Sequence, residues 1–131
     1  MKQALLPAGW TKPRGYANGV AARGTQVFVA GQIGWDAEGR FKSSDFAAQA
    51  RQALTNIVAV LAAAGARPEH LVRLTWYVTD KREYLAALKD IGGAYRELIG
   101  NYDIAMSAVQ VAALIEDEAK VEIEATAVIP D

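Results

Sequence analysis

The carboxylate of Glu122 stands among small and apolar neighbours, a setting in which an acidic side chain could do chemistry. It lies in VEIEATAVI (121–129), whose residues alternate with the period of two that is typical of a strand. One face of this strand is apolar and is predicted to join the core: Val121, Ile123, Ala125 and Ala127. The other face carries Glu122 with Glu124, Thr126 and Val128.

A second alternating run, AMSAVQV (105–111), precedes it across a short acidic turn. Met106, Ala108 and Gln110 point to one side of this run, and Ser107, Val109 and Val111 to the other. Because Gln110 shares a face with Met106, it is a candidate neutral hydrogen-bonding group for a ligand.

Several other chemistries find no support in the sequence. A single histidine, His70, without any cysteine cannot provide a metal ligand set. A serine triad is not supported either, because the sequence has no second histidine and no G-x-S-x-G turn. GQIGWDAEG (31–39) has glycines but not the spacing of a phosphate loop. We therefore expect no metal and no cofactor.

The two C-terminal runs also form part of a longer pattern. Upstream stand GYANGV (15–20), VFVAGQIGWD (27–36), DFAAQARQALTNIVAVLAAAG (45–65) and LVRLTWYVTD (71–80). In this order, these motifs resemble the YjgF/RidA group of reactive-intermediate deaminases over nearly the whole chain. The resemblance implies hydrolysis of the C=N bond of 2-imino acids and their enamine tautomers. Such a reaction needs a group that holds the substrate carboxylate, a polar group that places water, and a dry cleft.

The family's site residues carry over in part. The resemblance implies catalytic roles for Glu122, which would help to place water, and Tyr16, which would close the cleft. Gly31 matches the family's glycine, and Ala30 stands where serine is often found.

Three positions depart from the family's pattern. Met106 stands where an arginine grips the substrate carboxylate, Ala108 where a cysteine is common, and Gly92 where a helix asparagine lines the cleft. We therefore expect a less charged or more apolar ligand than usual. Arg14, close to Tyr16, is a hypothetical replacement cation at the cleft mouth.

Composition suits a single domain over residues 1–131. The 131 residues are 52% hydrophobic, enough for one core, and the net charge of −1 argues against a nucleic-acid or anionic-membrane footprint. The first ten residues do not resemble a signal peptide, and no apolar run approaches the ~20 residues that span a bilayer. A cytoplasmic protein without membrane or nucleic-acid partners is expected.

The remaining elements follow from periodicity. Strands are predicted at Tyr16–Ala22, Gln26–Ala30, Arg40–Lys42 and Val72–Val78, after a segment (1–14) without clear periodicity. A helix is predicted from Asp45, with Ser44 as N-cap, an apolar stripe from Phe46 to Leu61 and Gly65 as its stop. A second helix is predicted over Lys81–Ile99, with close backbone approach explaining Gly92-Gly93.

This order predicts an α+β domain in which both helices cover one face of a single mixed sheet. Met106, Ala108, Thr126 and Val128 are expected on the bare face, which a second copy should cover. The resemblance implies a homotrimer with small-molecule sites in the clefts between subunits.

Three functions remain open at this point. The first is a divergent enamine or imine deaminase, supported by Tyr16, Gly31 and Glu122. The second is a non-catalytic small-molecule binding or regulatory trimer, supported by Met106, Ala108 and Gly92. The third, a ribonuclease or translation inhibitor, is disfavoured by the sequence pI of about 5.8 and the lack of a basic stripe.

Overall fold

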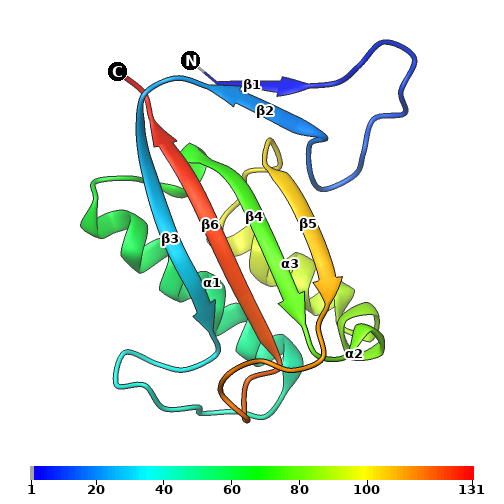
Figure 1. Ribbon diagram of the computed structural model, residues 1–131, viewed down its shortest axis with the longest axis vertical. Helices are drawn as coiled ribbons and strands as arrows, with labels where there is room; N and C mark the ends of the chain where they lie inside the picture. The colour runs from blue at the N-terminus through cyan, green and yellow to red at the C-terminus, as the bar shows by residue number, and fades with distance from the viewer. Residues whose placement is uncertain (1) are drawn as a thin grey trace.

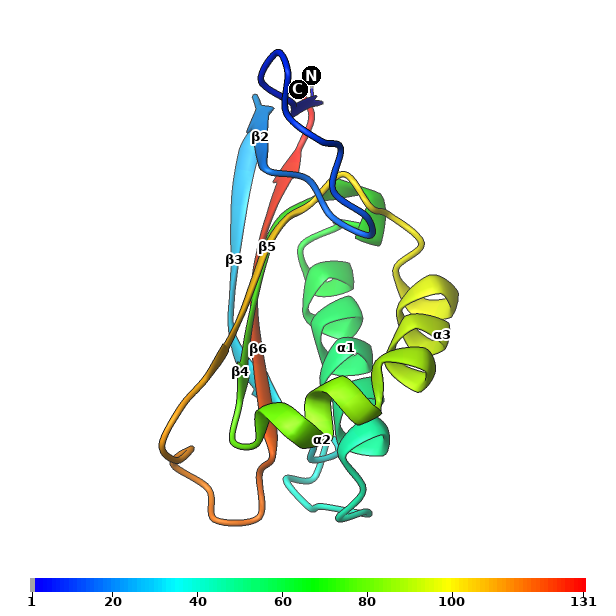
Figure 2. The same ribbon diagram turned by 90° about the vertical axis from the view of Figure 1, so that its right-hand side faces the viewer.

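A four-stranded mixed sheet forms the centre of the computed structural model, which describes residues 2–131 (Figure 1). Its order is β3-β6-β4-β5, in which only β4 and β5 run parallel; the strands are β3 (Thr25–Ile33), β4 (Leu71–Val78), β5 (Ala105–Gln110) and β6 (Val121–Ile129). The helices all lie on one face of this sheet and leave the other bare (Figure 2): α1 (Phe46–Ala63), α2 (Lys81–Ala86) and α3 (Leu88–Leu98). The predicted α+β architecture is confirmed.

A hairpin of β1 (Lys2–Leu5) and β2 (Gly19–Ala22) forms a separate two-stranded sheet. Four mostly exposed residues in β1 left no hydrophobic pattern from which this strand could be predicted. The strand predicted from Tyr16 starts only at Gly19; before it, Ala17 donates its N–H to the Ile104 carbonyl at 2.9 Å. This bond holds the long β1–β2 connection beside the start of β5.

The start of α1 corrects the predicted cap. Asp45, with φ −76° and ψ 131°, accepts the N–H of Ala48 at 2.9 Å, so it takes the place assigned to Ser44. The predicted apolar stripe is buried, and Gly65, at φ 75°, follows the helix end as expected. The strand predicted at Arg40–Lys42 is reduced to one bridge between Trp35 and Phe41.

The long second helix is interrupted at Ala87, whose φ −97° and ψ 4° separate α2 from α3. Asp80 caps α2 by accepting the N–H of Arg82 at 2.8 Å. A Cβ on Gly92 or Gly93 would meet nothing within 4 Å, so the close backbone approach proposed for these glycines is wrong.

The core lies between the sheet and the helices. Leu54, Ile57 and Leu61 of α1 are fully buried against Leu74 and Ile123 of the sheet. No helix within residues 2–131 has the length and apolar character that crossing a bilayer would require.

Candidate functional site

The direction of β5 decides where the site residues lie. Met106 is paired in register with Leu74, Ala108 with Trp76 and Gln110 with Val78. Since these three β4 residues face the helices in the core, the β5 residues beside them point to the helix side as well. The expectation that Met106 and Ala108 lie on the bare face with Thr126 and Val128 is therefore wrong.

Four predicted site residues line one cavity of ≈ 490 Å³ on the helix side: Arg14, Tyr16, Gly92 and Met106. The other residues of its wall come from the β1–β2 connection, β4, α2, α3 and the segment before β5, and most are apolar or aromatic: Gly15, Trp76, Tyr84, Leu88, Ile91, Tyr95, Arg96 and Tyr102. A larger cavity of ≈ 570 Å³ beside the β5–β6 loop contains none of the predicted site residues.

The deep part of the cavity is aromatic. Trp76 is 2% exposed and packs edge-on against Tyr84, with ring centroids 6.1 Å apart. Burial raises the pKa of the Tyr84 hydroxyl, and the same cause raises the pKa of Tyr95 above its usual range. The Trp76 indole Nε1 is buried without a hydrogen-bond partner among residues 2–131, which leaves a costly polar group in this wall.

The charges of the cavity lining are on exposed residues. Arg14 and Arg96 are its only charged lining residues within the described chain, and both are exposed. Neither guanidinium forms an ion pair with any residue from 2 to 131. Sequence reasoning overlooked Arg96, although it stands four residues after Gly92 and therefore shares its helix face.

A second cluster lies on the bare face of the sheet. Glu122 alternates with the buried Val121 and Ile123 and so projects away from the helices. A Cβ on Gly31 would overlap the Glu122 carboxylate, so this glycine allows the acid to lie directly against the backbone. Gly31 and Ala30 occupy an irregularity of β3 between Val29 and Gln32.

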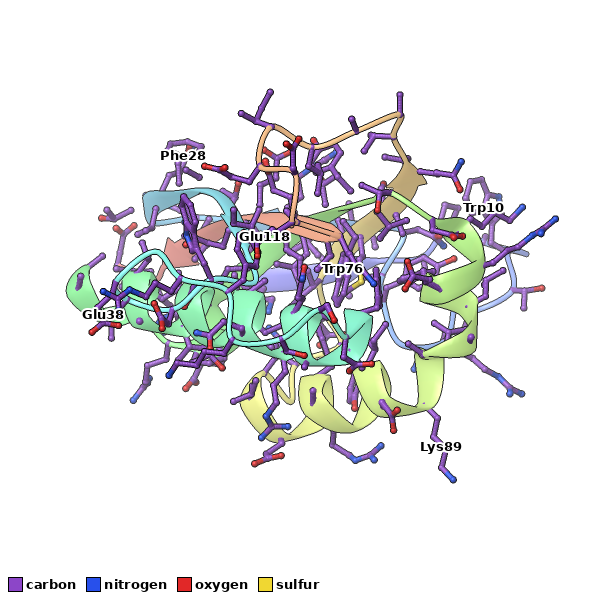
Figure 3. All side chains as sticks on the ribbon, turned by 90° about the horizontal axis from the view of Figure 1, so that it is seen from below. Trp10, Phe28, Glu38, Trp76, Lys89 and Glu118 are labelled. Atoms are coloured by element: carbon purple, nitrogen blue, oxygen red, sulfur yellow. The ribbon has the colours of Figure 1, made fainter. Side chains whose placement is uncertain are left out.

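The bare face also holds groups that were not predicted as site residues. Tyr77 donates its hydroxyl to Glu124, and this hydrogen bond raises the pKa of the phenol. Phe28 is 72% exposed on this face. Figure 3 shows Phe28 on the side of the sheet away from the helices and Trp76 between the sheet and the helices.

Two predicted ligand contacts belong to neither cluster. The Gln110 side-chain oxygen accepts the N–H of Lys81 at 2.7 Å and so supports the start of α2. Ala108 neighbours Trp76 across the β4–β5 ladder but does not line the cavity.

Comparison with known proteins identifies relatives in sequence and in fold. Residues 11–129 match the family model described as Endoribonuclease L-PSP. The chain belongs to the YjgF/RidA family. The RutC family protein PH0854 of Pyrococcus horikoshii is 34% identical over 97% of this chain and 98% of that protein. The 2-iminobutanoate/2-iminopropanoate deaminase of Salmonella typhimurium is 35% identical over 86% of each chain.

A solved structure extends the likeness to three dimensions. The Rid-family protein YyfB of Yersinia pestis matches with a TM-score of 0.85 at 32% identity, over 98% of both chains. The YjgF/RidA fold thus accounts for the sheet, the helices and their order.

Proposed function

We propose that this chain is an imine or enamine deaminase whose complete site forms between two copies. The observation that carries the proposal is the separation of the site residues. Tyr16 and Met106 line a cavity on the helix side, whereas Glu122 and Gly31 lie on the opposite face of the sheet. One chain cannot direct both groups at one small molecule, but the bare face of one copy can close over the cavity of the next in a homotrimer.

The reaction needs few groups. An imine carbon in the closed site is attacked by water, whose proton passes to the Glu122 carboxylate as the C–O bond forms. The carboxylate returns that proton to nitrogen, which gives a neutral carbinolamine. It then transfers the hydroxyl proton to nitrogen, and ammonia departs as the C–N bond breaks and the C=O bond forms. The sum is one C=N bond and one water converted into one C=O bond and one ammonia.

Met106 restricts which imino acids the site can bind tightly. Loss of the arginine from an arginine–carboxylate pair costs on the order of 2–5 kcal/mol of binding free energy, which weakens binding roughly thirty- to several-thousand-fold. Methionine supplies flexible apolar surface instead. Small 2-imino acids, which depend on that pair, should therefore be poor substrates.

Ammonia release tests the proposal. Imines are generated in place by an amino-acid oxidase from a small and from a large apolar amino acid, and ammonia is followed with wild type, Glu122→Gln and Met106→Arg. We expect wild type to accelerate only the large imine and Glu122→Gln to abolish that acceleration. Met106→Arg should gain activity on the small imine, because it restores a cation to the cavity wall.

The competing function is a non-catalytic binding trimer, which Met106 in place of the arginine also favours. It predicts saturable ligand binding together with ammonia release at the uncatalysed rate for every imine. Fast wild-type turnover of 2-iminopropanoate would contradict the interpretation of Met106 in both functions.

A further inference from the structure

The buried part of the cavity wall is apolar, and both charges of the lining belong to exposed residues. Its inner wall includes Trp76, Ile91 and Tyr95, which are 2%, 6% and 5% exposed. Met106, half-buried, packs against this core. No charged side chain within residues 2–131 lines this inner part.

The two arginines of the lining come from unrelated segments. Arg14 belongs to the connection between β1 and β2, and Arg96 lies near the end of α3. Two like charges in the lining of one cavity repel each other, and no acid within residues 2–131 forms an ion pair with either. An anionic group between them would relieve this repulsion.

We infer that the ligand binds with its large apolar group against Trp76 and Met106 and its anionic group at the mouth, between Arg14 and Arg96. For the reaction proposed above, on which this assignment of the substrate rests, the substrate class is a 2-imino acid with an aromatic or branched side chain. In such a substrate the carboxylate carbon is bonded to the C=N carbon. Both groups therefore lie at the mouth, where Glu122 of a second copy can approach. The carboxylate is thus held by arginines at the rim of the cavity, instead of by an arginine in its wall at the position of Met106.

The size of the cavity agrees with this class. Its ≈ 490 Å³ lies within the range of small-molecule pockets and exceeds what a methyl or ethyl side chain would fill. Aromatic rings such as those of Tyr84 and Tyr95 pack favourably against a further ring. A substrate with a small side chain would leave this wall in contact with water and would gain little binding free energy from burying apolar surface.

Binding of stable probes tests the orientation without any turnover. The probes are 3-phenylpropanoate, its neutral amide and propanoate, which separate the contribution of the charge from that of the ring. Three tryptophans give three indole N–H signals in a ¹H–¹⁵N spectrum, and the signal lost in Trp76→Phe identifies the one from the cavity. A change in the chemical shift of this signal reports that a probe occupies the cavity.

We expect 3-phenylpropanoate to bind more tightly than both other probes. Arg14→Gln and Arg96→Gln should each weaken it roughly twofold to fivefold, as expected for exposed charge pairs, and leave the amide unchanged. Arg40→Gln, in a loop away from the cavity, is the matched control and should leave all three probes unchanged. Met106→Arg should reverse the preference by strengthening propanoate relative to 3-phenylpropanoate.

Thermal unfolding of each variant establishes that it is folded before its binding is compared. Equal affinity for acid and amide, tighter binding of propanoate by wild type, or no Trp76 shift with any probe would overturn the inference. Because these measurements involve no turnover, an absence of ammonia release would refute the deaminase alone and leave the binding orientation standing.

Discussion

Gly31 and Gly34 stand three residues apart in and after β3, and the absent side chain serves a different purpose at each. A Cβ at Gly31 would displace the end of the flexible Glu122 side chain. A Cβ at Gly34 would come within 2.8 Å of the Gln49 Cα in α1, where backbone cannot yield. The first glycine therefore serves the carboxylate, and the second serves the packing of helix on sheet.

This contrast predicts opposite phenotypes for one added methyl group. Gly31→Ala should keep the unfolding free energy within about 1 kcal/mol of wild type and yet lose ammonia release as Glu122→Gln does. Gly34→Ala should cost about 1–3 kcal/mol in urea unfolding, because overpacking there moves α1. Equal loss of stability in both variants would show that the Glu122 side chain cannot move aside.

Residue types were more predictable than the directions of side chains. Alternation placed Glu122 opposite the core correctly, because its neighbours Val121 and Ile123 are both fully buried. In β5 the same alternation gave the wrong face for Met106, because both faces of this edge strand are half-buried or exposed. A period of two separates two faces, but only burial says which of them meets the helices.

At the scale of elements, the start of α1 rests on one carboxylate. Asp45 accepts the Ala48 N–H, while the neighbouring Ser44 forms no cap in the described structure. Asp45→Ala should lower the unfolding free energy by about 1 kcal/mol, whereas Ser44→Ala should change it little. Urea unfolding of the two variants measures this directly; a larger loss from Ser44→Ala would restore the cap predicted from sequence.

The other elements show why boundaries were harder to predict than element types. The stripe of α1 persists over 18 residues, so its period identified the helix despite the one-residue error in the cap. The break at Ala87 carries no glycine or proline signal, and the Ala87 N–H still reaches the carbonyls of Glu83 and Tyr84. The break between α2 and α3 therefore has no local sequence signal, and periodicity alone could not show it.

At the scale of the molecule, the bare face of the sheet exposes Phe28 at 72% and Val109 at 45%, which a covering copy would bury. Phe28→Asp should convert the predicted trimer into monomers, because a charge would then be desolvated at the interface. Ile115→Asp is the matched control, since this loop residue is 97% exposed and should leave the mass unchanged. Light scattering at micromolar concentration gives the mass; a wild-type monomer would contradict both the assembly and the shared site.

Mixed assemblies test whether one site takes residues from two copies. Tyr16→Ala and Glu122→Gln should each be inactive alone, because every site in either assembly lacks one group. When equal amounts are unfolded and refolded together, a site is complete if its cavity comes from a Glu122→Gln chain and its carboxylate from a Tyr16→Ala chain. Random assembly makes about a quarter of the sites complete, so about a quarter of the wild-type rate of ammonia release should return. If both residues acted within one chain, no chain in the mixture would hold both groups and no activity would return. Phe28→Asp placed in both chains is the control, since it should abolish the recovery by preventing contact between copies.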